Sequence, residues 1–384
     1  MASGPLPVLV ECLEGIPDPR IARTRLHPLI DILALSISAV VCGAEGWDDI
    51  VSFGHGKLTW LKDRLGLELP NGIPSADTIR RVFTRLDPQA LEAAFRAWTK
   101  SLHQLTHGEV IALDGKVLRH SFDTACEQNA IHLVSAWASS ARLVLGQVKV
   151  SEKSNEITAV PQLLDWLEIA GCTVTVDALN TQKAIAAKII AKGADYALAL
   201  KDNHHALYAD VVGHFEHQQK QRFENVAYST YSDSYIGHGR IETRRCELIT
   251  LAQCDPLWRD IQKDWIGLRS LARITCVRQT PQKTTEEVRY YLCSVPDNAK
   301  RVLWTVRKHW GIENRLHYVL DVSFDEDACR IRKDHAPENF GVLRHIALNL
   351  LRQEKTSQRG IKARQKQAGW DHTYLERVLI AAED

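Results

Sequence analysis

The 384-residue sequence lacks a hydrophobic run long enough to cross a bilayer. Its most apolar stretch, His27 to Cys42, is too short for a membrane span and contains Asp31. The N-terminal region also lacks the apolar core of a secretory signal peptide, because Glu11 and Glu14 lie where that core would be. These absences exclude the usual membrane and secreted classes, and we expect a cytoplasmic protein.

Signatures of structural zinc are missing as well. None of the nine cysteines forms a CxxC pair or a Cys/His pattern with zinc-ligand spacing. Scattered cysteines in a chain of this length indicate a reducing compartment, where most of them act as small buried hydrophobes. The formal net charge is only +1, so any surface for nucleic acid must come from local basic patches.

What is present is the composition of an ordinary globular protein, with 45% hydrophobic and 25% charged residues and room for two or three domains. Residues 1–105 are predicted to be helical. Ser75 is expected to cap a helix from Ala76 to Leu86, with Arg80, Arg81 and Arg85 along one flank. Such a flank suits contact with phosphates, and a solvated charged face is the alternative.

The first clear strand is the apolar run Val110 to Leu113, which is followed directly by Asp114 and Gly115. A short apolar run bounded by a turn signal indicates a strand buried on both faces. A carboxylate at the tip of a central strand lies where open sheets gather their catalytic groups. An Asp-Gly turn without a function is the alternative.

Further predicted elements follow in the order strand, strand, helix, strand, helix, strand. They are residues 131–138, 143–150, 158–170, 173–176, a helix from Thr181 as its cap to residue 192, and 196–200. Together with the first strand this is the order of an RNase H-like sheet, whose first and fourth strands lie side by side. Asp177 ends the fourth strand, so it would be a neighbour of Asp114. Two close carboxylates favour a divalent metal ion with oxygen ligands.

The region 204–296 reads as an inserted, mainly β subdomain, and a strong helix follows it. In this helix Val306, Trp310, Glu313, His317 and Leu320 recur at steps of four and three, which predicts that Glu313 packs against the sheet. A buried carboxylate needs a partner. That partner is either an arginine, Arg307 or Arg315, or the metal site, to which Glu313 would be the third ligand.

More acidic residues crowd the end of this region. Asp321 shares a helix face with Glu313 and is the second choice for the acidic ligand. The alternative interpretation is a helix-end network with Arg330 and Arg332, formed by Asp321, Asp325, Glu326 and Asp327.

Four motifs carry a resemblance to a known family: IALDGK, VTVDALNTQ, LALKDN and HWGIENRLHYVLDVSFDEDACRIRKDHAPENFGVLRHIALNLLR. They resemble the ISAs-type insertion-sequence transposases, which include the H-repeat-associated proteins, within the DDE transposase group. The resemblance implies an α/β fold with an RNase H-like mixed-sheet catalytic core (106–203 and 297–351). It also implies a helical N-terminal DNA-binding or association domain (1–105), a β-rich insertion (204–296) and a basic C-terminal segment (352–384).

The same resemblance implies an activity: metal-dependent cleavage and strand transfer at insertion-sequence ends. Asp114, Asp177 and Glu313 would be the catalytic and metal-binding triad, with two Mg²⁺ or Mn²⁺ ions per active site. The partners would be double-stranded DNA, as terminal inverted repeats and as target, and a second copy of the chain, with association with the bacterial nucleoid. The expected DNA-binding residues are Arg80, Arg81, Arg85, Lys116, Arg119, Lys201, Asn203, His238, Arg240, Arg315, Arg330 and Arg332.

Two departures from the family pattern keep alternatives open. A Tyr, Arg and Lys found at fixed steps around the glutamate in many transposases with a β insertion are replaced by Val306, His309 and Leu320, so a hairpin intermediate is not implied. The sequences HSFD and KDNHH also stand where Gly- and Gln-containing sequences are expected for the family. The alternatives are a domesticated, transposase-derived DNA-binding protein and a nuclease without strand transfer. The basic segment after residue 351 is either a solvated tail or a DNA contact.

Overall fold

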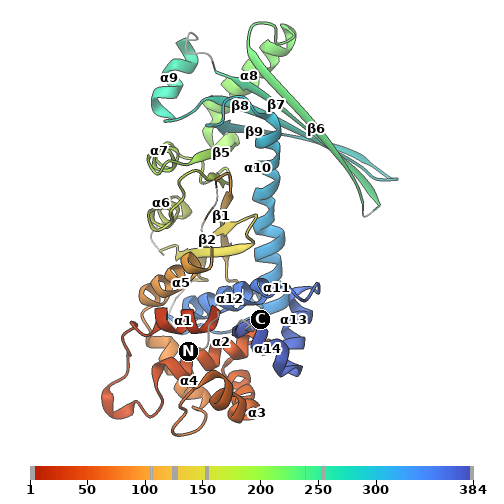
Figure 1. The fold of residues 1–384 in the computed structure, drawn as a ribbon. Coiled ribbons are helices and arrows are strands. Elements are labelled where there is room, and N and C mark those ends of the chain that lie inside the picture. The colour runs from red at the N-terminus through yellow and green to blue at the C-terminus, as the bar shows by residue number, and fades with distance from the viewer. Residues whose placement is uncertain are drawn as a thin grey trace.

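The computed structural model describes residues 5–103, 105, 107–122, 129–151, 155–237, 239–251 and 256–380. The molecule is elongated, with a helical body at one end and a sheet above it (Figure 1). Within the described ranges, no helix is both long and apolar enough to cross a membrane.

The helical body combines the two ends of the chain, which lie close together in it (Figure 1). From the N-terminal side come α1 (Pro5–Leu13), a 3₁₀ turn (Ala22–Thr24), α2 (Leu29–Val41), α3 (Trp47–Leu65), α4 (Ala76–Arg85) and α5 (Pro88–Leu102). From the C-terminal side come α11 (Tyr318–Phe324), α12 (Ala336–Gln353), α13 (Ile361–Trp370) and α14 (His372–Leu379). One apolar core joins them and includes Leu9, Phe83, Trp98, Phe340 and Tyr374.

Local signals explain the start of α4. The Ser75 side chain accepts a hydrogen bond from the Thr78 N–H, which satisfies one of the free donors of the first turn, as the sequence predicted. The segment after residue 351 is packed against the helical body and is not a solvated tail. Arg364 is buried and donates to the carbonyls of Leu351, Glu354 and Ser357, so it holds α13 against the body.

The sheet has nine strands in the order β3-β2-β1-β4-β5-β9-β8-β7-β6. The strands are β1 (Val110–Val117), β2 (His132–Ala138), β3 (Leu143–Lys149), β4 (Thr173–Val176), β5 (Asp195–Leu200), β6 (Ala227–Gly237), β7 (Arg240–Thr250), β8 (Ser270–Gln279) and β9 (Thr284–Cys293). β1 runs parallel to β4, and β4 runs parallel to β5. All other pairs are antiparallel, so the fold is mixed α/β.

The first and fourth strands are thus neighbours, with Leu113 opposite Val176. The strands of the region 204–296 continue the same sheet, because β9 pairs with β5. That region also holds a 3₁₀ turn (Asp202–His204), α8 (His205–Lys220) and α9 (Pro256–Asp264). Trp258 and Trp265 are buried there, as core residues.

The two faces of β1 have different neighbours. Ile111 and Leu113 share an apolar cluster with α6 (Glu156–Trp166) and α7 (Lys183–Ala191). Because side chains alternate along a strand, Ala112, Asp114 and Lys116 point to the opposite face. The long helix α10 (Ala299–Ile312) crosses β1 and runs from the outer strands down to the helical body (Figure 1).

Candidate active site

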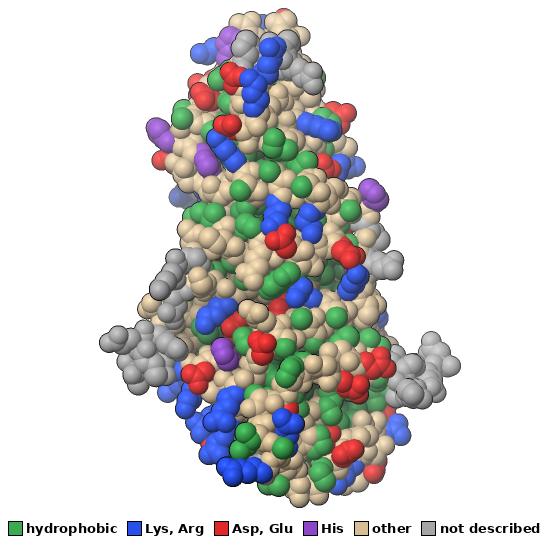
Figure 2. Space-filling model, turned by 90° about the vertical axis from the view of Figure 1, so that its left-hand side faces the viewer, with side chains coloured by type: hydrophobic (Ala, Val, Ile, Leu, Met, Phe, Trp, Pro, Cys, Tyr) green, Lys and Arg blue, Asp and Glu red, His purple; other side chains and the backbone are tan. Residues whose placement is uncertain are grey.

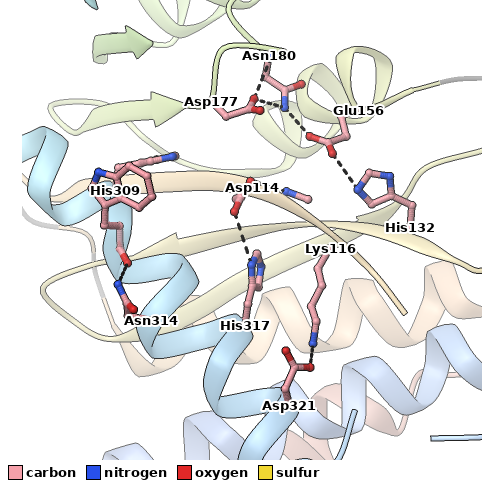
Figure 3. A network of polar contacts seen from close by, with 12 residues as sticks. Asp114, Lys116, His132, Glu156, Asp177, Asn180, His309, Asn314, His317 and Asp321 are labelled. Atoms are coloured by element: carbon pink, nitrogen blue, oxygen red, sulfur yellow. Dashed lines mark hydrogen bonds and ion pairs between the residues drawn. The ribbon is translucent and has the colours of Figure 1, made fainter. Parts of the chain in front are cut away.

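Asp114 lies on the α10 face of β1, with its side chain 19% exposed. Its Oδ1 accepts a hydrogen bond from the Gly115 N–H at 3.0 Å. Its Oδ2 lies 3.6 Å from Nδ1 of His317, which points up from the helix below the sheet (Figure 3). Burial lowers the pKa of His317 to about 4, so the imidazole is neutral at pH 7 and does not balance the charge of Asp114.

Asp177 follows β4 and is held by Asn180, which lies three residues later. The backbone N–H and the side-chain amide of Asn180 both donate to Asp177 Oδ1, at 3.0 and 2.9 Å. The same amide donates to Glu156 at 2.6 Å, and Glu156 pairs with His132 at 2.8 Å (Figure 3). A chain of polar contacts therefore fixes the orientation of Asp177 from the far side of the sheet.

Sequence reasoning missed Glu156, Asn180 and His132. The one sequence feature that could have pointed to them is Gly115, the glycine that follows Asp114. A Cβ at Gly115 would lie 2.3 Å from Glu156 Oε1 and 2.5 Å from His132 Nε2, so any larger residue would displace this pair. Gly115 therefore leaves room for the Glu156–His132 pair, which the turn interpretation alone did not reveal.

The charges around Asp114 are of one sign. Burial, followed by the carboxylates of Asp177, Glu156 and Glu313, raises the pKa of Asp114 to about 7. Burial would also raise the pKa of Glu156, but the hydrogen bonds from His132 and Asn180 outweigh it and lower that pKa. Like-charged groups in a half-buried site favour a cation between them.

Glu313 departs from the prediction that it packs against the sheet. α10 ends at Ile312 and a π-helical turn, Glu313–His317, follows, in which Glu313 is exposed and Leu316 is buried. The predicted stripe assumed an uninterrupted α-helix, and the π-turn changes which residues face inward. The prediction of a buried Glu313 is therefore wrong.

Glu313 nonetheless belongs to this neighbourhood. Burial raises its pKa, and the nearby charges of Arg289 and Lys201 oppose that change. One of the predicted arginine partners, Arg307, pairs with Asp233 instead. In the part of the chain that the structure describes, no three Asp, Glu, His or Cys side chains lie close enough together to hold a metal ion.

The second acidic cluster surrounds Lys116. Its ammonium pairs with Asp321, with Glu326 at 2.7 Å and with Asp327 at 3.7 Å. Arg119 also contacts Asp327, and the buried Arg344 lies 3.7 Å from Glu326. The cations of this network are therefore not Arg330 and Arg332, as the sequence suggested, and Asp321 is committed to Lys116 rather than to the site.

The other expected DNA-binding residues lie in several places. Arg80, Arg81 and Arg85 are exposed on α4, and the first two pair with Asp77. This helix belongs to the helical body, over which Lys and Arg side chains gather on one face (Figure 2).

Lys201 and Asn203 follow β5 near the site, and Asn203 donates to the Ala178 carbonyl at 2.6 Å. Arg315 and Arg330 are exposed, while Arg332 donates to the His120 carbonyl at 2.9 Å. Arg240 pairs with Glu242 at 2.7 Å, and His238 lies outside the described residues. Lys116 has a half-buried, triply paired ammonium that is not free for DNA.

Comparison with known proteins identifies the family of this chain. Residues 106–350 match the family model described as the transposase DDE domain, and residues 10–99 match the one described as DDE_Tnp_1-associated. "Putative transposase YncI" of Escherichia coli O157:H7 is 40% identical over 98% of this chain and 95% of its own length. "H repeat-associated putative transposase YhhI" of Escherichia coli K12 is 39% identical over 97% of this chain and 98% of its own.

Among solved structures, a piggyBac transposase synaptic complex with hairpin DNA covers 98% of this chain and 78% of its own, at 12% identity and a TM-score of 0.44, which is too low to support an argument. The family models and the relatives are decisive by themselves. The chain therefore belongs to the DDE transposases, together with the H repeat-associated proteins that its motifs resemble.

Proposed function

We propose that this protein cleaves DNA at the ends of an insertion sequence and joins those ends to target DNA, in a reaction that depends on divalent metal ions. One observation carries the proposal: Asp114 and Asp177 stand at adjacent parallel strands in a family of DDE transposases, with no cation among the groups that set the pKa of Asp114. The core is RNase H-like in this proposal. The order β3-β2-β1-β4-β5, with β1 parallel to β4, supports it.

The donor set fits a hard divalent cation. Asp114 and Asp177 offer carboxylate oxygens, which Mg²⁺ and Mn²⁺ prefer, and their like charges gain from a cation between them. Glu313 is the proposed third ligand, and its exposed position on the π-turn leaves it free to reorient toward the other two. When bound, two such ions would supply Lewis acidity, which lowers the pKa of a water or a 3′-hydroxyl and stabilises the leaving oxygen.

The side chains around the site have distinct tasks in this reaction. Asn180 occupies Oδ1 of Asp177 and leaves Oδ2 available as a ligand, and the Gly115 N–H does the same for Asp114. Arg289 and Lys201, whose charges act on Glu313, would attract the phosphodiester into the site. No covalent enzyme intermediate is required.

DNA recognition would fall to α4, the outer strands β6–β9 and the basic helices after α12, within the domain division 1–105, 106–203 with 297–351, 204–296 and 352–384. The protein would act as a homodimer that holds two element ends, in the cytoplasm at the nucleoid. A nuclease that cuts without joining and a domesticated DNA-binding protein are the alternatives, and the family match favours the transposase over both.

Separate Asp114→Ala, Asp177→Ala and Glu313→Ala variants test the proposal. Each should abolish cleavage of cognate end DNA in Mg²⁺ or Mn²⁺ while binding of that DNA is largely kept. Retained cleavage in one variant would remove that residue from the triad. Cleavage without joined products in the wild type would identify the nuclease instead.

A further inference from the structure

A groove with basic side chains lies along α10, on a different side from Glu313. Trp304, Lys308 and Gly311 follow one another at steps of four and three, so they share one face of α10, and Arg315 of the π-turn lies beside them. With Ser139 and Arg307 they line a groove of about 260 Å³. Glu313 comes two residues after Gly311, about 200° around the helix from that face.

The groove is also displaced along the sheet from Asp114. The Ser139 hydroxyl donates to the Lys308 carbonyl at 3.1 Å, and the Ser139 N–H donates to the Val110 carbonyl at the start of β1. Asp114 lies four residues further along that strand, which is roughly 13 Å. The groove is therefore lined by residues other than the carboxylates of the active site.

Two more arginines bring charge to the same place. Arg352, at the end of α12, donates to the carbonyls of Arg142 and Arg315, and its guanidinium lies 4.5 Å from the centre of the Trp137 ring. It thereby ties the β2–β3 turn to the π-turn. Arg142 at that turn is exposed, as is Arg315.

Arg307 of the groove lining pairs with Asp233, but the acid whose charge acts on Lys308 is held by other groups. Glu109 acts on Lys308 at a distance, but its own oxygens accept hydrogen bonds from the N–H groups of Val110, Ser140 and Ala141. Burial and the charges of neighbouring cations lower the pKa values of Lys308, Arg315 and Arg352 together. Cations that repel one another on a surface gain from a polyanion.

In an inference that rests on the proposed function, we propose that this back groove, lined by Lys308 and Arg315 with Arg142 beside it and Trp304 at its upper end, binds the phosphodiester backbone of DNA outside the active site. Trp304 is 42% exposed, and the Lys308 ammonium lies 4.8 Å above its ring, so the upper end offers both an apolar surface and a cation. Arginine and lysine side chains without acid partners are the usual contacts to DNA phosphates. Of these residues only Arg315 was expected from the family to contact DNA.

Duplex binding as a function of salt tests the groove. The full chain with Arg142→Gln, Lys308→Gln and Arg315→Gln is compared with a matched variant, Lys183→Gln, Lys188→Gln and Lys263→Gln, whose three lysines already pair with Asp264, Asp165 and Asp260. Both variants lose the same charge. With a fluorescent random-sequence duplex, the groove variant should lower the slope of log affinity against log salt by up to about three units, and the matched variant by clearly less.

A thermal melt in sodium pyrophosphate gives a second readout. At low ionic strength the groove variant should melt higher than wild type, because it lacks the repelling charges, and pyrophosphate should raise the melting temperature of the wild type only. An unchanged slope for duplex DNA would overturn the proposal even if pyrophosphate stabilises the wild type, since the groove would then hold small anions. If the groove variant keeps the salt slope of wild type but loses self-association, the proposal is also overturned. The groove would then bind an acidic surface of another protein. Neither result depends on cleavage, so both are independent of the triad variants.

Discussion

Asp114 and Lys116 stand two residues apart on the same face of β1, yet the acids around them serve different purposes. At Asp114, burial and then the charges of three carboxylates raise the pKa to about 7. Around Lys116, three carboxylates gather at a cation, and all three belong to the segment after the π-turn, where the sequence marked Asp321 as a ligand candidate. The two clusters differ in charge balance, which only the fold reveals. We call the carboxylates around Asp114 the unsatisfied cluster and those around Lys116 the satisfied cluster.

The satisfied cluster should matter most for stability. Glu326→Gln would leave Lys116 and the buried Arg344 short of a charge partner, and breaking a buried pair costs about 3–5 kcal/mol. Urea unfolding at neutral pH measures this loss. Asp327→Asn is the control, because Asp327 lies 3.7 Å from Lys116 with its side chain 26% exposed, and it should cost far less. Equal losses in the two variants would contradict the assignment.

The carboxylates around Asp114 should instead lower the free energy of unfolding of the metal-free protein. The pKa of Asp114 rises from 3.8 to about 7 on folding, so between these values the folded protein holds a proton that the unfolded chain has released. The free energy of unfolding of the metal-free protein therefore falls as the pH rises through this window, by a few kcal/mol at most. Asp114→Asn should remove this loss and be more stable than wild type at about pH 8.

Unfolding of both proteins in EDTA at about pH 5 and about pH 8 measures that difference. His309, His317 and His345, each with a pKa lowered to about 4 by burial, destabilise both proteins in acid, so the comparison between the two isolates Asp114. A constant difference across the window would show that Asp114 keeps an ordinary pKa.

Glu313 and Glu156 sharpen the comparison further, since both act on Asp114 but only Glu156 is held by hydrogen bonds. Glu156→Gln should cost about 1–2 kcal/mol and keep the gain in melting temperature from Mn²⁺. Glu313→Gln, at an exposed position, should change stability by less than about 0.5 kcal/mol and gain less from Mn²⁺. The reverse pattern would make Glu156 the third ligand.

The smallest effect is expected on α4. Replacing Arg80, Arg81 and Arg85 with Ala should lower the salt slope of end-DNA binding by roughly one unit for each lost phosphate contact. Asp77→Asn should change the salt slope in the opposite direction. Asp77 pairs with Arg80 and Arg81, so its loss frees both arginines for DNA. If neither variant changes the slope, this helix has a solvated face.

Much of the architecture could be predicted because its signals are local. Apolar runs that end in Asp114 and Asp177 predicted two central strands, and their pairing followed from the order of elements. Thr181 shows the limit of such reasoning. It was expected to cap a helix, yet its hydroxyl lies 3.0 Å from the Asp177 carbonyl and 2.6 Å from that of Ala199 and joins the ends of two parallel strands.

Other features depend on contacts between distant segments. Glu156 sits at the start of a helix, and only folding brings it to Asn180 and His132. The basic composition after residue 351 indicated an exposed segment, but Arg364 satisfies carbonyls of the helix before it. Glu313 was misplaced because the counting of helical steps cannot detect a π-turn.

The π-turn makes this segment sensitive to the deletion of a single residue. A π-helical turn accommodates an additional residue, so it sets the angular offset between the helix before it and the helix after it. Deletion of one residue within Glu313–His317 would allow regular winding to continue and would rotate α11 by about 100° relative to α10. Asp321 would then leave Lys116 although every side chain of both helices were kept. In this part of the chain, spacing is therefore as strictly constrained as residue identity.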